Sequence, residues 1–212
     1  MSAGGNGGVA ARFAALCLDE KGHLSVSDYA DLGLRGALLV DLVLAGRVTQ
    51  TDESVDLDAA PRGDPLADRA LNELDVLGGR SLDWWLEHSA IGLGTAAADL
   101  VASGAWEQLP RQALHRGPRF AVRRPDRPAH DAAVLSGLER PGSVEDAAVA
   151  AIAAAAGLAG ARVSGPPEEL LESTGSAAWA CRLVTDFVSE ARIEGTAVSR
   201  ASLTALWAAM PT

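Results

Sequence analysis

Arginines are the residues of this sequence whose type and spacing could do chemistry. Residues 111–127 contain six arginines and one acid, Asp126, so this segment carries a formal charge of +5 in a chain of net charge −10. A guanidinium group holds a phosphate through paired hydrogen bonds. The segment is therefore predicted to bind lipid phosphates, nucleic-acid phosphates or an acidic protein surface, unless the chain's own acids neutralise it. Its arginines are Arg111, Arg116, Arg119, Arg123, Arg124 and Arg127.

Other reactive residue types do not form a recognisable site. The two cysteines, Cys17 and Cys181, are interpreted as reduced core residues rather than a disulfide. The four histidines do not occur at metal-ligand spacing, and the sequence has no phosphate-loop, nucleophile-elbow, zincin or EF-hand motif. We therefore predict a binding protein rather than an enzyme, with no catalytic residue, no metal and no cofactor.

Composition predicts the fold class. Hydrophobic residues make up 48% of the 212 residues and aromatic residues only 4%, so Ala, Leu and Val must build the core. Ala and Leu favour helices. Trp84 and Trp85 are adjacent on a predicted helix, so one is expected in the core and the other partly exposed, with a ligand pocket as the alternative. Trp106, Trp179 and Trp207 are expected in the core.

The sequence pattern predicts a series of helices and two hairpins, which would position the arginines and tryptophans named above. Residues 1–8 are predicted to be a disordered tail, and residues 9–210 a single domain. Val9–Leu18 fits a short helix or a strand that enters a turn. Hydrophobic spacing and glycine or serine boundaries predict helices over residues 28–45, 66–77, 82–86, 94–103, 131–138, 143–157, 167–174, 176–193 and 199–209, and hairpins over residues 47–57 and 105–122.

The sequence shows no signal peptide and no transmembrane span. Its longest apolar stretch, residues 147–161, is rich in alanine and too short to cross a bilayer comfortably. A cytoplasmic protein is expected, with peripheral attachment to the inner face of a membrane as a further possibility. The preference for Arg over Lys, together with the abundance of Ala and Gly, is typical of a GC-rich bacterial genome.

One segment resembles a known family. Residues 33–47, GLRGALLVDLVLAGR, open with Gly33-Leu34-Arg35-Gly36 and close with Gly46-Arg47. A Gly-Asp loop, a leucine-rich helix, a tryptophan helix, a Leu-Val-x-x-Gly helix end and a hairpin then follow in order. With this arrangement from about residue 13 to 209, the sequence resembles the Golgi phosphoprotein 3 family.

The resemblance implies both a fold and a ligand. It implies a single-domain helical bundle wrapped by amphipathic helices, with a projecting hairpin, and peripheral membrane association through phosphatidylinositol 4-phosphate. Arg35 matches one headgroup-binding arginine of the family. The family's tryptophan falls at or near Val26, and its two helix arginines fall near residues 90–93, where this sequence has no aromatic residue and no cation, respectively. The predicted headgroup-binding residues are therefore Arg35, from the resemblance, and the six arginines of residues 111–127, from the charge of that segment.

Three kinds of partner stay open at this point. The first hypothesis is a peripheral membrane protein that recognises anionic lipid headgroups. The second is a winged-helix-like protein that binds nucleic acid through the basic hairpin 105–127, although the segment before it, IGLGTAAADLVASG, has no Arg or Lys. The third is a scaffold for protein partners without lipid binding. The hairpin could also pair with a second copy of the chain.

Overall fold

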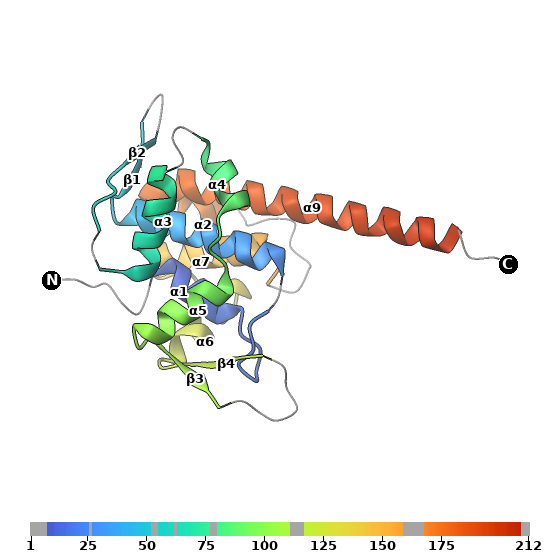
Figure 1. Cartoon of the computed structure of the whole chain (residues 1–212), viewed down its shortest axis with the longest axis horizontal. Coiled ribbons are helices and arrows are strands. Elements are labelled where there is room, and N and C mark those ends of the chain that lie inside the picture. Colours follow the sequence, from blue (N-terminus) through green and yellow to red (C-terminus); the bar gives the residue numbers. More distant parts are fainter. Residues whose placement is uncertain are drawn as a thin grey trace.

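The computed structural model describes residues 8–25, 27–51, 55–61, 63–76, 80–110, 117–158 and 168–208. The expected tail therefore lies outside the described residues except for Gly8. Within these ranges the chain is mainly α-helical with two antiparallel hairpins, as predicted (Figure 1). The elements are α1 (Val9–Leu16), α2 (Asp28–Leu44), β1 (Val48–Gln50), β2 (Val55–Leu57), α3 (Pro65–Val76), α4 (Leu82–His88), α5 (Leu93–Ala102), β3 (Trp106–Leu109), β4 (Arg119–Val122), α6 (Asp126–Leu135), α7 (Val144–Ala155), α8 (Glu168–Glu172), a 3-10 turn (Gly175–Ala177) and α9 (Ala178–Ala208).

Helices α2 and α7 form the centre of the bundle. Helix α2 contacts α1, α3, α4, α5, α7 and α9, and α7 contacts α1, α6, α8 and α9 (Figure 1). Every residue of α7 from Asp146 to Ala155 is buried, and eight of these ten are alanine or valine. Small side chains allow helices to pack closely on all sides of α7. The alanine-rich composition therefore produces a core of closely spaced helices.

Two glycines of the Gly-Leu-Arg-Gly segment allow α2 to touch its neighbours. A Cβ atom on Gly33 would lie 2.4 Å from Cζ of Phe13 on α1, and one on Gly36 would lie 2.0 Å from Cγ1 of Val184 on α9. Both separations are too short for any side chain larger than hydrogen. The glycines of this motif are therefore explained by helix packing.

The substitution Gly36→Ala is expected to lower the free energy of unfolding by about 1–3 kcal/mol, because the new methyl group must displace Val184 or α9. The matched control is Gly94→Ala on α5, where a Cβ would have no atom within 4 Å. At that site alanine should be neutral or stabilising, by up to about 1 kcal/mol. Urea denaturation of the two variants measures both effects. Equal stability of both variants would contradict close packing between α2 and α9.

A half-buried carboxylate on α2 caps helix α1. Asp41 accepts hydrogen bonds from the backbone N–H of Val9 at 2.7 Å and of Ala10 at 2.9 Å. These are two of the N–H groups that have no partner within a helix. Burial raises the pKa of Asp41 to about 6, although the two hydrogen bonds act in the opposite direction. The cap is therefore a long-range contact that joins α1 to the centre of the bundle.

This raised pKa predicts a pH dependence of stability. A group with a raised folded-state pKa stabilises the fold fully below its unfolded pKa, near 4, and loses that contribution as the pH rises through about 6. Asp41→Asn does not titrate at this position, so its stability relative to wild type should increase by about 2 kcal/mol between pH 4 and pH 7. Urea denaturation at both pH values measures this difference. A difference that is constant with pH, or that changes in the opposite direction, would refute the assignment.

Several predicted boundaries differ from the structure. The helix expected over residues 131–138 begins at Asp126, because Pro128 in the first turn needs no N–H partner. The two helices expected over residues 176–193 and 199–209 form one helix, α9, so the predicted break between them is wrong. A Cβ on Gly195 would lie 1.8 Å from the hydroxyl of Tyr29, so this glycine permits a close contact rather than ending a helix.

Val9–Leu18 proves to be mainly helix, and Leu18 then pairs with Leu24 in an isolated antiparallel bridge. The far part of α9 extends beyond the bundle (Figure 1). Among the described helices, none combines the length and the apolar character that a membrane crossing requires.

Candidate anion-binding site

The hairpin of β3 and β4 is fixed to the bundle at its base. Gly104, with φ of +77°, turns the chain from α5 into β3, a conformation that favours glycine. The rings of Trp106 and Phe120 contact each other with centroids 5.8 Å apart, and both side chains are buried. The backbone N–H of Phe120 also donates to the carbonyl of Gly22 at 2.8 Å. The end of β4 therefore has a defined position next to α1 and α6.

This geometry places four of the predicted arginines at the hairpin. Arg119 lies on β4 and donates from Nε to the carbonyl of Lys21 at 2.7 Å. Arg123 and Arg124 follow β4, Arg127 lies in the first turn of α6, and these three residues are exposed. Arg111 and Arg116 lie outside the described residues.

The chain's own acids leave these charges largely unpaired. In the described part of the chain, no carboxylate lies within ion-pair distance of Arg119, Arg123 or Arg124. Nη2 of Arg127 lies 4.0 Å from Oδ1 of Asp146, at the limit of an ion pair. Positive charge therefore stays available on this end of the molecule.

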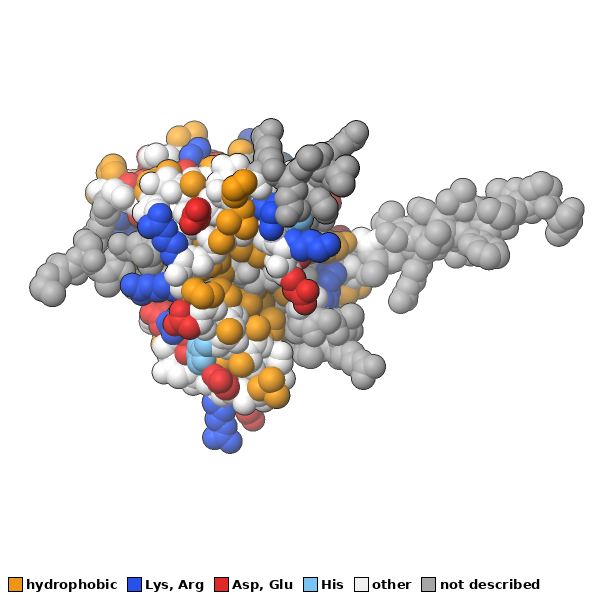
Figure 2. All heavy atoms as spheres, turned by 90° about the horizontal axis from the view of Figure 1, so that it is seen from below, with side chains coloured by type: hydrophobic (Ala, Val, Ile, Leu, Met, Phe, Trp, Pro, Cys, Tyr) orange, Lys and Arg blue, Asp and Glu red, His pale blue; other side chains and the backbone are white. Residues whose placement is uncertain are grey.

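Three of these arginines border one cavity. The cavity has a volume of about 240 Å³ and lies between α1, the start of β3, the end of β4 and α6. In the view of the molecule from below, basic side chains border a hydrophobic strip, with acidic side chains among them (Figure 2). The described residues that line the cavity are Ala11, Arg12, Ala15, Gly104, Ala105, Trp106, Val122, Arg123, Arg124, Arg127, Pro128 and Asp131.

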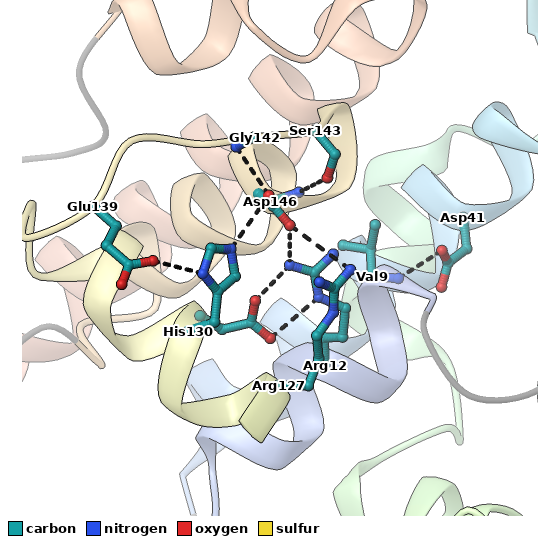
Figure 3. A network of polar contacts seen from close by, with 10 residues as sticks. Val9, Arg12, Asp41, Arg127, His130, Glu139, Gly142, Ser143 and Asp146 are labelled. Carbon is teal, nitrogen blue, oxygen red and sulfur yellow. Dashed lines mark hydrogen bonds and ion pairs between the residues drawn. The ribbon is translucent and has the colours of Figure 1, made fainter. Parts of the chain in front are cut away.

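The inner wall of the cavity contains a buried arginine that sequence reasoning did not select. Arg12 on α1 is 3% exposed. Its Nε donates to Oδ2 of Asp131 at 3.1 Å, and its Nη2 donates to Oδ1 of Asp131 and, at 2.6 Å, to Oδ1 of Asp146 (Figure 3). These bonds join α1 to α6 and α7. The remaining nitrogen, Nη1, is buried and has no hydrogen-bond partner in the part of the chain that the structure describes.

Burial alone would raise the pKa of Asp146, but hydrogen bonds from Arg12, Ser143 and Gly142 outweigh it and hold the pKa well below its usual range. His130 extends this network. Its Nε2 lies 3.4 Å from Oδ2 of Asp146, and its Nδ1 lies 2.7 Å from Oε2 of Glu139 (Figure 3). Hydrogen bonds to these two carboxylates raise the pKa of His130.

His130, Asp131 and Asp146 place one donor atom each within 4.8 Å of one another, which would suit a metal ion. Arg12 already supplies a cation to both aspartates. The arrangement is therefore an Arg–Asp–Asp–His network that holds three helices together, and we assign it that structural role. Cys17 and Cys181 are both buried and unpaired, as predicted, and burial raises the pKa of their thiols to about 12 and about 11.

Arg35 lies elsewhere in the fold. Its Nε donates to the carbonyl of Ile91 at 2.7 Å, and its Nη1 donates to the carbonyls of Leu86 at 2.7 Å and Glu87 at 3.0 Å. A guanidinium group at the C-terminal end of a helix satisfies carbonyls that lack partners there. Arg35 thus joins α2 to the end of α4, and α4 and the β3–β4 hairpin lie on opposite sides of the bundle (Figure 1). The structure does not bring Arg35 to the arginine-lined cavity.

The family positions near residues 90–93 do lie beside Arg35, since the carbonyl of Ile91 accepts its hydrogen bond. Val26 lies outside the described residues. The structure therefore places Arg35 beside the family's two helix-arginine positions, although Ala90, Ile91, Gly92 and Leu93 supply no positive charge.

A second hollow lies between α3 and α4, with a volume of about 770 Å³. Trp84 and Trp85 both line it. Trp85 is buried and donates from Nε1 to Glu73 at 3.0 Å, whereas Trp84 is partly exposed, as their adjacent positions predicted. The ring of Trp84 stacks on His88 with centroids 4.4 Å apart, and Cζ of Arg80 lies 4.1 Å from the centroid of Trp84.

The fold defines the class of protein to which the chain belongs: a helical bundle with a glycine-packed central helix and a basic hairpin. The sequence matches the model of the Golgi phosphoprotein 3 family (GPP34) over residues 10–202. The chain therefore belongs to this family, as the resemblance predicted. No curated protein matches the chain in sequence.

Proposed function

We propose that this chain binds anionic phospholipid headgroups and associates peripherally with a membrane through the end of the molecule that carries β4 and the start of α6. The observation that carries the proposal is the set of exposed arginines there, of which Arg123 and Arg124 make no ion pair with a described acid. Each basic residue near an anionic membrane contributes about 1 kcal/mol. The three exposed arginines, Arg123, Arg124 and Arg127, together with the half-buried Arg119, are enough for reversible attachment.

The net charge of the whole chain favours an orientation in which the end that carries β4 and the start of α6 faces the membrane. The net charge of −10 repels an anionic surface, so only a locally basic end can approach it. A winged-helix mode on nucleic acid is less favoured, because α5, the helix before the hairpin, has no basic residue and carries Asp99. The proposed role is binding rather than catalysis.

Membership of the Golgi phosphoprotein 3 family supports a lipid ligand, and the chemistry around Arg35 bears on which lipid. Three hydrogen bonds of Arg35 are directed to backbone carbonyls, and the neighbouring family positions carry no cation. We therefore propose recognition of anionic charge in general, with no strong preference for phosphatidylinositol 4-phosphate.

Co-sedimentation with vesicles tests this proposal. The vesicles contain neutral lipid alone, or neutral lipid with phosphatidylglycerol, phosphatidylinositol or phosphatidylinositol 4-phosphate, each at low and physiological salt. Binding to every anionic vesicle that weakens with salt supports the proposal. Binding only to phosphatidylinositol 4-phosphate would replace it with the family's specific ligand. Absence of binding to all vesicles would contradict it and favour a scaffold for protein partners.

A further inference from the structure

We infer that the cavity lined by Arg12, Arg123, Arg124 and Arg127 is a binding site for a phosphate group. This inference deepens the proposed function: it assigns the headgroup phosphate to a built pocket rather than to a diffuse basic surface. The same pocket chemistry would accept the phosphate of a lipid headgroup or a free phosphate, and the experiment below separates these two sources.

The first observation is an unsatisfied buried donor. Arg12 lines the cavity, its side chain is 3% exposed, and its Nη1 has no hydrogen-bond acceptor among the described residues. Buried polar groups of native proteins nearly always have a hydrogen-bond partner. Nη1 of Arg12 is therefore expected to donate to an acceptor that the described residues do not supply. An oxygen atom of a ligand in the cavity would supply one.

The second observation is the charge around the cavity. Four arginines and one carboxylate, that of Asp131, are its described charged lining residues. Both oxygens of Asp131 already accept hydrogen bonds from Arg12, so this carboxylate is neutralised locally. Arg123 and Arg124 make no ion pair with a described acid. An anion with several acceptor oxygens therefore fits the cavity better than a cation or a neutral group.

The third observation is the size and the shape of the cavity. A volume of about 240 Å³ accommodates a phosphate together with a small attached group. Arg12 lies at the buried side, and the exposed residues Arg123, Arg124 and Arg127 lie at the open side. Trp106 and Val122 add apolar wall on the hairpin side. Because the open side carries the arginines proposed to face the membrane, a lipid phosphate could enter without leaving the bilayer surface.

The test uses the full chain and inorganic phosphate as the first probe, with isothermal titration calorimetry as the readout. The cavity variant is Arg124→Gln/Arg127→Gln. The matched control is Arg69→Gln/Arg182→Gln, which removes the same charge from exposed arginines on α3 and α9. Arg12 is left intact, because its bonds to two aspartates hold the helices together. Thermal melting establishes that both variants remain folded.

Saturable phosphate binding by wild type is expected, with at least a tenfold loss of affinity in the cavity variant, because two charged hydrogen-bond donors to the phosphate are removed. The control should bind like wild type. Acetate and chloride should not compete at equal ionic strength. No saturable phosphate binding, equal losses in both variants, or equal competition by chloride would overturn the inference; the last of these outcomes would indicate charge screening alone.

A second arm identifies the source of the phosphate and separates this inference from the proposed function. Wild type and both variants are sedimented with phosphatidic acid vesicles, with and without added inorganic phosphate, with sodium chloride matching the ionic strength. Competition by phosphate that the cavity variant lacks would assign the lipid headgroup to the cavity. Vesicle binding that is indifferent to phosphate, but weaker for the cavity variant than for the control, would refute the cavity site and leave the proposed function standing. Phosphate binding without vesicle binding would refute the proposed function and assign the cavity to a free phosphate.

Discussion

Replacement of Arg12 by alanine is expected to lower the free energy of unfolding by about 3–5 kcal/mol. The physical reason is that Asp131 and Asp146 are buried and would lose the cation that both of them contact. Asp131 would then have no cation beside it, and a buried carboxylate without its cation costs far more than the loss of one packed side chain. Urea denaturation followed by circular dichroism measures the change. The melting temperature should fall in parallel.

The control for this prediction is an ion pair of the same type on the surface. Arg69 contacts Asp99 at 3.4 Å, with half of the arginine side chain exposed. Arg69→Ala is therefore expected to cost less than about 1 kcal/mol, because water and salt screen the pair. If Arg12→Ala cost no more than Arg69→Ala, the network would not be holding α1, α6 and α7 together.

Local signals in the sequence predicted most helix boundaries correctly. Ser81 accepts a hydrogen bond from the N–H of Trp84 at 3.2 Å, and Asp64 accepts from the N–H groups of Leu66 and Ala67, as expected of residues that begin a helix. These local signals gave a wrong helix boundary where a contact between residues far apart in the sequence determines the structure. The predicted break between residues 193 and 199 contains Gly195, whose lack of a side chain makes room for Tyr29, far away in the sequence.

The residues of the candidate site were likewise predicted only in part from the sequence. The excess of arginine over residues 111–127 is a property of the sequence alone, and it identified three residues that line the cavity. The contribution of Arg12 depends on partners 119 and 134 positions away, which no local pattern reveals. One signal was present: Arg12 is the only charged residue in the apolar stretch from Val9 to Leu18, and buried charges require partners.

The second prediction with a large expected effect concerns the affinity of the protein for anionic membranes. Arg123→Glu/Arg124→Glu is expected to weaken binding to anionic vesicles by about 4 kcal/mol, about a thousandfold, because two attractions of about 1 kcal/mol become two repulsions. Neither side chain contributes an ion pair to the fold in the described residues, so stability should change little. The control Arg69→Glu/Arg182→Glu makes the same change in net charge on α3 and α9. It should bind vesicles almost as well as wild type.

The decisive measurement is co-sedimentation of wild type and these two charge-reversed proteins with phosphatidylglycerol vesicles at low salt. We expect wild type and the α3/α9 control to sediment with the vesicles, and the Arg123→Glu/Arg124→Glu protein to stay in the supernatant while remaining folded. If all three proteins bound equally well, the end of the molecule that carries β4 and α6 would not be the membrane-binding surface. If wild type itself stayed in the supernatant, the chain would not bind anionic lipid.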